Sequence, residues 1–211
     1  MKHFKNFKTC VYCTAQTLAS LDETTLARDY AYLEKYVGID KVYLETYRDG
    51  TWVSIDHMKM IQNFFKEHGV EIAGGITTVT PPLEKDDVKR QRLFQTFCYS
   101  NEAMRTYLKK IVTYTAELFD EIILDDFFFT SCTCDDCLRE RSNLSWAEFR
   151  SKKMIDVAEN LVLKPAKLAN PSVKVTIKYP NWRESYHETG YVPKIQPSMF
   201  DKIYTGTETR N

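Results

Sequence analysis

Hydrophobic residues along this chain fall into two alternating patterns. Short apolar runs bounded by polar residues are typical of buried strands, and six occur, at 8–13, 41–44, 70–76, 121–126, 173–179 and 201–205. Between them, apolar residues recur every three or four positions, which predicts helices at 23–36, between Ser54 and Gly69, at 101–119 and from Ser145 to about Leu168. Strands that alternate with helices predict a parallel sheet with the helices packed outside it.

Local signals refine this pattern. Ser145 is followed three residues later by Glu148, a capping-box pattern that marks the start of the last helix. Pro165 lies inside that helix and is expected to kink it or to begin a new segment. The stretch 77–96 is polar and highly charged, which predicts a long loop with one short helix. The paired glycines at 74–75 predict a close backbone approach or a bulge in the third strand.

These elements favour a TIM-type (β/α)8 barrel over a flavodoxin-like open sheet. The open sheet requires a phosphate-binding glycine loop after the first strand, and residues 13–17 (CTAQT) contain no glycine. A complete barrel of this type has about 250 residues, whereas this chain has 211. We therefore expect one barrel domain over residues 1–211 that is incomplete at its C-terminus, with about six βα units.

Charge and hydropathy exclude two classes of partner. Lys plus Arg and Asp plus Glu both number 29, so no net charge recruits nucleic acid or an anionic membrane. No apolar stretch is long enough to cross a bilayer. The start, MKHFKNFKTCVYC, lacks the apolar segment of a secretory signal, which leaves open a cytoplasmic protein or an exported one whose signal has been removed. The sequence does not indicate an oligomeric state.

Two carboxylates, Asp125 and Asp126, follow the apolar run of the fourth predicted strand. In α/β barrels the chemistry takes place at this end of the strands. Glycoside hydrolysis needs two carboxylates that flank the scissile bond, one to protonate the leaving oxygen and one to attack or to activate water. We expect Asp126 rather than Asp125 to face the barrel mouth as the catalytic residue. The second acid is Glu208, just beyond the sixth strand, or less favourably Glu45; the alternative is an aspartate pair that only caps loop amides.

Residues on the predicted loops after the strands are the candidates for sugar binding. Glu45 and Arg48 suit hydrogen bonds to hydroxyl groups, or they form a plain ion pair within the loop. Aromatic rings pack against the apolar C–H face of a sugar, and several at one mouth would form subsites. The aromatic candidates are Tyr47, Trp52, Phe127, Trp182 and Tyr186. Ordinary loop packing is the alternative for each ring taken singly.

Three cysteines, Cys132, Cys134 and Cys137, lie within one loop in the pattern C-x-C-x-x-C. Zinc prefers four tetrahedral ligands and binds thiolate sulfur well. Cys98, at the start of the third predicted helix, is the best candidate for the fourth ligand. The alternative is three surface thiols and a buried Cys98. A second C-x-x-C, at 10–13, lies on a predicted strand whose alternation points the two side chains to opposite faces, so no second metal site is expected.

Over residues 97–149 the sequence resembles barrel glycoside hydrolases of the clan that contains the zinc-cluster β-galactosidases (family 42) and related hypothetical glycosyl hydrolases. Those proteins carry a cysteine in an upstream C-x-N/S-x segment, an acidic end of strand four, a C-x-C-x-x-C loop and a helix. The matching residues here are Cys98 in CYSNEAMR, Asp125, Asp126, Cys132, Cys134 and Cys137. The resemblance implies a carbohydrate substrate and a structural zinc held by the four cysteines. Outside residues 97–149 the resemblance extends only to the order of strands and helices.

The chain departs from that family at the acids. The β-galactosidases have Asn-Glu at the end of strand four, with the Glu as acid/base, and their nucleophile lies on strand seven. This chain has Asp-Asp, and no seventh strand is predicted. The chain also resembles the α-galactosidase and α-glucosidase group, in which a strand-four Asp is the nucleophile and a strand-six carboxylate the acid/base, as Asp126 and Glu208 would be.

The sequence does not decide which acid is the nucleophile, which sugar is bound, or whether the anomeric configuration is retained or inverted. Three other functions compete with a complete glycosidase. A non-catalytic carbohydrate-binding barrel would use the acids only to bind hydroxyl groups, and a catalytically incomplete fragment would lack its second acid. A metal-dependent hydrolase is the least favoured, because histidine-rich strand ends are missing.

Overall fold

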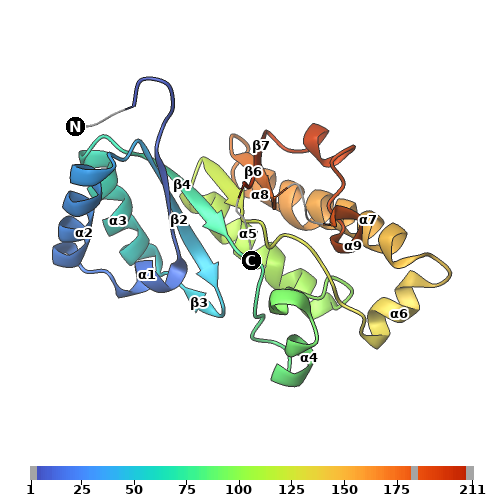
Figure 1. Cartoon of the computed structure of the whole chain (residues 1–211). Coiled ribbons are helices and arrows are strands. Elements are labelled where there is room, and N and C mark those ends of the chain that lie inside the picture. The colour runs from blue at the N-terminus through green and yellow to red at the C-terminus, as the bar shows by residue number, and fades with distance from the viewer. Residues whose placement is uncertain (1–3, 182–184, 208–211) are drawn as a thin grey trace.

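A computed structural model describes residues 4–181 and 185–207 of the chain. Within this part, six parallel strands form one sheet in the order β1-β2-β4-β5-β6-β7, and the short β3 pairs antiparallel with the end of β2 (Figure 1). The strands are β1 (Cys10–Cys13), β2 (Lys41–Arg48), β3 (Thr51–Trp52), β4 (Glu71–Ile76), β5 (Glu121–Leu124), β6 (Lys174–Tyr179) and β7 (Lys202–Thr205). All six predicted strands are confirmed.

The helices connect successive strands, as the alternating pattern predicted. The α-helices are α1 (Ala15–Ser20), α2 (Glu23–Tyr36), α3 (Ile55–Glu67), α4 (Asp86–Arg90), α5 (Glu102–Leu118), α6 (Asp135–Arg141), α7 (Trp146–Val157), α8 (Lys164–Ala169) and α9 (Tyr186–Thr189). Two 3₁₀ turns lie at Leu93–Gln95 and Gln196–Ser198. None of the helices in the described segments is both long enough and apolar enough to span a bilayer.

The last long helix changes at Pro165, as predicted. It starts with the expected capping box, in which the Ser145 hydroxyl accepts from the Glu148 amide and the Glu148 carboxylate accepts from the Ser145 amide. A π-helical turn (Ala158–Leu163) joins α7 to α8, and Pro165 lies in the first turn of α8, the new helical segment. The first turn of a helix tolerates proline, because its missing N–H would have no intrahelical partner there.

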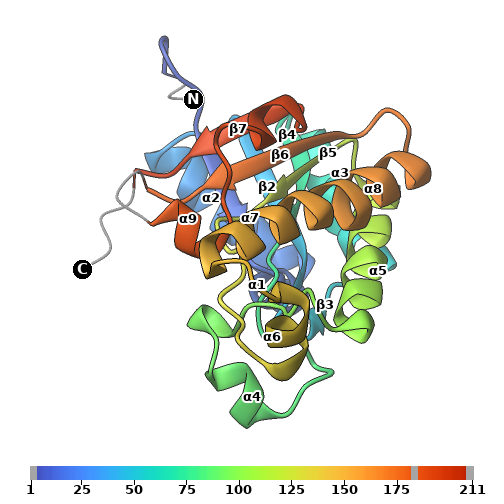
Figure 2. The same ribbon diagram turned by 90° about the vertical axis from the view of Figure 1, so that its right-hand side faces the viewer.

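Apolar side chains on the outer face of the sheet are buried against the helices. Near the N-terminus, Val42 of β2 belongs to one buried cluster with Ile61 of α3. Further along, Ile122 of β5 packs in a larger cluster that includes Ile111 of α5. Figure 2 shows α5, α7 and α8 along this face. Burial of such side chains stabilises the fold by about 1.5–3 kcal/mol each.

The sheet curls strongly, so that strands far apart in its order meet across the inner face. The hydroxyl groups of Tyr43 on β2 and Tyr204 on β7 lie 2.7 Å apart, although three strands separate β2 from β7 in the sheet. The Glu121 carboxylate pairs with Lys41 at 2.7 Å and with Lys202 at 2.8 Å. These contacts make the fold a half-barrel, as the expected incomplete (β/α) barrel requires.

The paired glycines of β4 permit this close packing. A Cβ atom on Gly74 would lie 2.7 Å from both Phe119 and Thr115, and one on Gly75 would lie 2.7 Å from the Tyr12 hydroxyl. The predicted close approach is therefore confirmed on both faces of the strand. The neighbouring β2 shows a register shift between Glu45 and Tyr47 where it pairs with β4.

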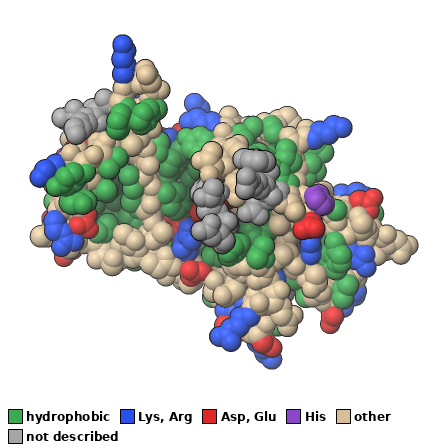
Figure 3. Space-filling model, viewed as in Figure 1, with side chains coloured by type: hydrophobic (Ala, Val, Ile, Leu, Met, Phe, Trp, Pro, Cys, Tyr) green, Lys and Arg blue, Asp and Glu red, His purple; other side chains and the backbone are tan. Residues whose placement is uncertain are grey.

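The two outer strands of the sheet each have one partner strand in the described part of the chain: β1 pairs with β2, and β7 pairs with β6. An apolar depression of about 280 Å³ lies beside β1 and is lined by Val11, Cys13, Leu18, Leu21, Leu26 and Tyr30 among others. Figure 3 shows hydrophobic side chains on this part of the surface. Both edges therefore present strand backbone, and the β1 edge also presents apolar surface.

Candidate functional site

Polar side chains gather on the inner face at the carboxyl ends of the strands. Alternation along the strands carries Tyr12 of β1, Glu45 of β2, Thr77 after β4, Asp125 after β5 and Lys178 of β6 to this face. Hydrogen bonds and ion pairs join them: Tyr12 and Thr77 both donate to Glu45, and Lys178 lies 3.4 Å from Asp125. Side chains from five strands therefore meet at this end of the sheet, which we call the rim. The rim is the candidate active site.

Glu45 is the buried anchor of this rim, with 0% of its side chain exposed. Its Oε1 accepts from the Tyr12 hydroxyl at 2.8 Å and from Thr77, and its Oε2 accepts from the Ala15 amide at 2.7 Å. The Arg48 Nε donates to Oε2 at 2.8 Å and to Oε1 at 3.1 Å. The geometry matches the ion-pair alternative for Glu45 and Arg48, because both oxygens of the carboxylate already have protein donors.

Arg48 links this anchor to the acids of β5. Its Nη2 lies 3.2 Å from Asp125 Oδ2 and donates to the Thr77 hydroxyl at 2.9 Å. Burial opposes the charge on Arg48, but the hydrogen bond and the attraction to Glu45 outweigh burial and raise its pKa. Arg48 is therefore a permanent cation that holds Asp125 in a fixed orientation.

The two aspartates are arranged differently from the expectation. The alternation of β5 carries Asp125 to the inner face with Ile123, where it joins Arg48, so the expectation that Asp126 takes this place instead of Asp125 is wrong. Asp126 is 3% exposed and its Oδ2 lies 3.5 Å from the Lys178 amine. Lys178 thus lies between both carboxylates.

Sequence reasoning missed Lys178, Thr77 and Tyr12. A signal for Lys178 was present, since a lysine near the end of a buried strand is as costly as the aspartates that were singled out. In VKVTIKY, Lys178 also lies two residues after Thr176, so both side chains point to the same face of the strand. Thr176 is buried on that inner face. Tyr12 carries no such signal, because a tyrosine in a short strand reads as core.

Two of the predicted sugar-binding aromatics pack away from the rim. Tyr47 is 0% exposed, and its ring contacts Trp52 at 5.2 Å and Tyr107 at 5.6 Å between centroids. Trp52 donates its indole N–H to the Tyr107 hydroxyl of α5 at 2.9 Å. Both rings therefore fill the space between the end of β2 and α5.

Phe127 is the predicted aromatic that does lie at the rim. The Arg48 guanidinium is 5.8 Å from the centroid of its ring, and the Phe94 ring meets it edge-on at 5.2 Å. Tyr186 instead packs against Tyr179, at 5.8 Å between ring centroids. The other two candidates, Trp182 and Glu208, lie outside the described residues.

The four predicted ligand cysteines lie together. Cys98, Cys132 and Cys137 are buried and Cys134 is half-buried, and their sulfur atoms all lie within 4.8 Å of one another. Cys98 stands before α5, whereas the other three follow β5, so the cluster ties two consecutive βα connections together. Cys10 and Cys13 lie on β1, where Cys10 is exposed and Cys13 is half-buried.

The sulfur geometry fits a tetrahedral metal. Cys98 Sγ is 3.7 Å from both Cys134 Sγ and Cys137 Sγ. Tetrahedral zinc with Zn–S bonds of about 2.3 Å places its sulfurs about 3.8 Å apart, whereas a disulfide requires about 2.05 Å. The donor set suits zinc.

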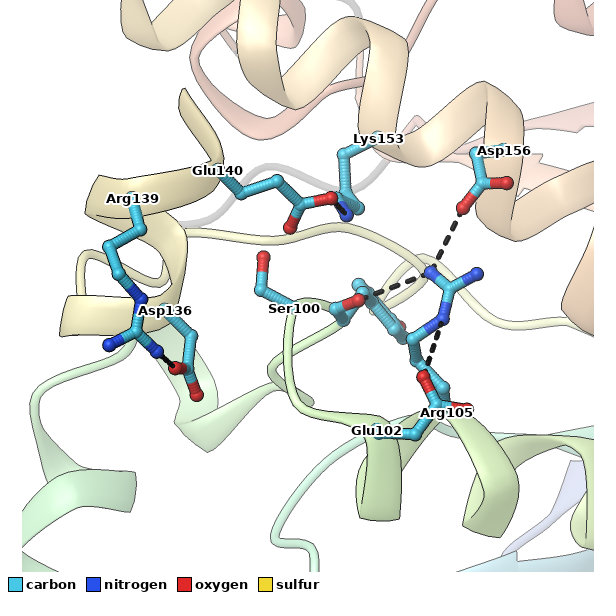
Figure 4. A pocket seen from close by; sticks show the side chains of 9 residues that line it. Ser100, Glu102, Arg105, Asp136, Arg139, Glu140, Lys153 and Asp156 are labelled. Atoms are coloured by element: carbon cyan, nitrogen blue, oxygen red, sulfur yellow. Dashed lines mark hydrogen bonds and ion pairs between the residues drawn. The ribbon is translucent and has the colours of Figure 1, made fainter. Parts of the chain in front are cut away.

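A polar cavity of about 470 Å³ lies beside the cysteine cluster, between α5, α6 and α7. Figure 4 shows the Ser100 hydroxyl, Glu140 and Lys153 around it, with Arg105 bonded to Asp156. Lys153 pairs with Glu140, and Arg105 pairs with Asp156 at 2.9 Å. Lys153 and Arg105 are therefore already paired with neighbouring carboxylates, and neither is free to bind an anionic ligand in the cavity.

Comparisons with known proteins agree with this architecture. The family model described as "Probable glycosyl hydrolase, catalytic domain" matches residues 1–211. The uncharacterized protein SSO3021 of Saccharolobus solfataricus is 34% identical over 230 residues, which cover 98% of this chain and 38% of that protein. The chain therefore spans well under half the length of this relative.

Solved structures show the same fold. A cold-adapted β-galactosidase from Rahnella sp. R3 superposes with a TM-score of 0.65 at 10% identity, over 95% of this chain and 39% of the enzyme. A β-galactosidase from the psychrophilic Marinomonas ef1 gives a TM-score of 0.65 at 12% identity, over 96% of this chain and 41% of the enzyme. The curled sheet thus corresponds to part of a β-galactosidase barrel, and by its family match the chain belongs to the probable glycosyl hydrolase catalytic domains.

Proposed function

We propose that this chain forms part of the barrel of a glycoside hydrolase, with its own catalytic carboxylate at the end of β5. The observation that carries the proposal is the pair Asp125 and Asp126, which meet one cation, Lys178, at the carboxyl end of a curled parallel sheet. In barrels of this kind that end holds the chemistry. The substrate is a carbohydrate, as the family implies.

The contacts support distinct roles for the two acids. Arg48 and Lys178 fix the orientation of Asp125, which suits a residue that holds substrate hydroxyl groups or stabilises charge. Although Asp125 takes the place on the inner face, Asp126 has its Oδ2 3.5 Å from the same Lys178 amine and is not held by Arg48 in the contacts above. We therefore assign to Asp126 the acid that gives or takes the proton at the glycosidic oxygen, or attacks the anomeric carbon. Both approach from one side of the mouth. The acid on the opposite side must come from another segment, either Glu208 or a strand that follows β7.

We further propose that additional strands complete the barrel. The outer edges of β1 and β7 carry no strand partner among the described residues, and exposed edges of a sheet pair readily. The apolar depression beside β1 suits cover by a helix of the missing units. The relative that is 34% identical extends far beyond the matched part, which supports a longer protein.

The cysteine cluster completes the proposal as a structural zinc centre held by Cys98, Cys132, Cys134 and Cys137. Four thiolates leave no open position on zinc, so the metal contributes stability rather than chemistry. The cluster fastens the loop after β5, which begins with Asp125 and Asp126, to the start of α5.

Hydrolysis of a panel of aryl α- and β-glycosides tests this function. The protein that contains the whole barrel is expected to turn over at least one of them, and residues 1–211 alone are expected to be nearly inactive. Asp126→Asn should lower kcat by about 10²–10⁴-fold, the usual contribution of acid–base catalysis. Asp136→Asn, a change at a partly exposed carboxylate of α6, is the matched control and should leave kcat unchanged.

Two results would contradict the proposal. Activity within threefold of the parent in both Asp125→Asn and Asp126→Asn would remove β5 from the chemistry. Tight sugar binding by the protein that contains the whole barrel, measured by calorimetry and without any turnover, would instead identify a carbohydrate-binding barrel.

A further inference from the structure

The connection between β4 and α5 forms a long excursion, residues 80–96, that we call the rim loop. Its ends are joined like a hairpin, because the Thr80 amide donates to the Gln95 carbonyl at 2.8 Å and Val79 bridges to Thr96. The loop contains α4, which projects past the carboxyl ends of the strands in Figure 1. The rim loop therefore stands beside the candidate mouth.

Arg92 fastens the rim loop to the cysteine cluster. Its side chain is only 2% exposed, and its Nη1 lies 3.9 Å from Cys132 Sγ. Its Nε donates to the Thr96 carbonyl at 2.5 Å, and its Nη2 pairs with Glu84. One guanidinium thus holds a sulfur of the cluster and two separate points of the loop.

A strained turn next to Arg92 carries an aromatic ring to the mouth. Phe94 and Gln95 have φ values of +51° and +54°, a left-handed backbone that residues other than glycine adopt only where the surroundings hold it. The Phe94 ring contacts Phe127 at 5.2 Å and Phe129 at 6.4 Å. Phe127 in turn lies beneath Arg48, the partner of the candidate acid. Contacts therefore run without a gap from the cluster to the rim.

The charge of the cluster depends on metal. Four thiolates around a divalent ion carry a net charge of −2, whereas four thiols carry none. An ionised sulfur adds the attraction of opposite charges to the hydrogen bond that it accepts from the Arg92 guanidinium, and a neutral thiol does not. Because Arg92 is buried, this difference acts with little screening by solvent.

We propose that Arg92 is a positioning residue that makes the placement of the rim loop, and of Phe94 at the mouth, depend on metal binding at the cysteine cluster. This inference rests on the proposed zinc centre and goes beyond it, since a purely structural zinc need not act on residues 80–96. With metal bound, Arg92 is drawn to Cys132 and holds the strained turn closed. Without it, Arg92 releases the turn and Phe94 leaves Phe127.

Hydrogen–deuterium exchange with mass spectrometry tests the coupling in the whole protein. Zinc-loaded and chelator-stripped samples of the wild type, Arg92→Gln and Arg139→Gln are compared, with elemental analysis of each. Arg139 is the matched control, because it is an exposed arginine on α6, close to the cluster in sequence but bonded to Asp136. In the wild type and in Arg139→Gln, stripping should speed exchange in residues 80–96 at least tenfold.

In Arg92→Gln, exchange in residues 80–96 should be fast in both states, while zinc remains near one per chain and peptides of β5 stay protected. That protection shows that the variant is folded. Arg92→Lys keeps the charge but loses the forked geometry, so its exchange rate in residues 80–96 should lie between those of the wild type and Arg92→Gln. This variant replaces Arg92→Gln in the comparison if Arg92→Gln does not fold. Zinc bound at one per chain with no change in exchange of residues 80–96 on stripping would overturn the coupling alone. Elemental analysis that finds no zinc in any sample would overturn the metal centre and the coupling together.

Discussion

Replacing Glu45 by alanine tests whether the rim depends on one buried carboxylate. Glu45 receives hydrogen bonds from Tyr12, Ala15, Thr77 and Arg48, which belong to three different βα units of the barrel. The change leaves the Ala15 amide without this acceptor and removes the principal counter-charge of Arg48. We therefore expect a large loss of stability rather than a local effect.

The magnitude follows from the contacts. Removal of one partner of a buried ion pair costs about 3–5 kcal/mol. Arg48 keeps Asp125 as a partner at 3.2 Å and is 19% exposed, so the expected loss for Glu45→Ala is near the lower end, about 3 kcal/mol. Glu45→Gln should cost less, about 1.5–2 kcal/mol. Its amide oxygen can keep the Ala15 and Arg48 bonds, and the hydroxyl groups of Tyr12 and Thr77 can turn to accept from its NH₂.

Urea unfolding followed by circular dichroism measures these losses. Glu71→Ala is the matched control on the neighbouring strand, because Glu71 forms an exposed ion pair with Lys8. Exposed pairs contribute about 0.2–1 kcal/mol, so this control should stay close to the wild type. The reasoning would be refuted if Glu45→Ala unfolded within about 1 kcal/mol of the wild type with an unchanged m-value.

Three further outcomes are expected. Cys134→Ser should lower bound zinc below one per chain and reduce the melting temperature, whereas elemental analysis without zinc and ready alkylation of the cysteines in the native protein would contradict the metal centre. Gly75→Ala should cost about 1–3 kcal/mol in urea unfolding, because the new Cβ meets the Tyr12 hydroxyl at 2.7 Å. Burial opposes the charge of Glu121, but hydrogen bonds from Lys202 and Lys41 outweigh it and lower the pKa. Its stabilisation is therefore present above the unfolded pKa of about 4.3 and is lost as the pH falls below it, so stability measured from pH 7 to pH 3 should fall less in Glu121→Gln than in the wild type.

The sequence by itself determined the strands, the main helices and the grouping of three cysteines. Strands buried on both faces read as apolar runs, and amphipathic helices repeat every three or four residues, so short windows of sequence reveal both. For the same reason β2 was predicted too short. Its last residues, 45–48, are mostly polar and resemble a loop, and only their pairing with β4 and β3 extends the strand to Arg48.

The tertiary structure alone decided which side chains meet. Tyr43 bonds to a tyrosine 161 residues away, and Arg92 reaches a sulfur 40 residues away. No local pattern encodes such contacts, because they depend on the curl of the sheet and on the path of the rim loop. The same holds for the β5 acids: the sequence named Asp125 and Asp126, but the strand register and the position of Lys178 decided which of them joins Arg48 on the inner face.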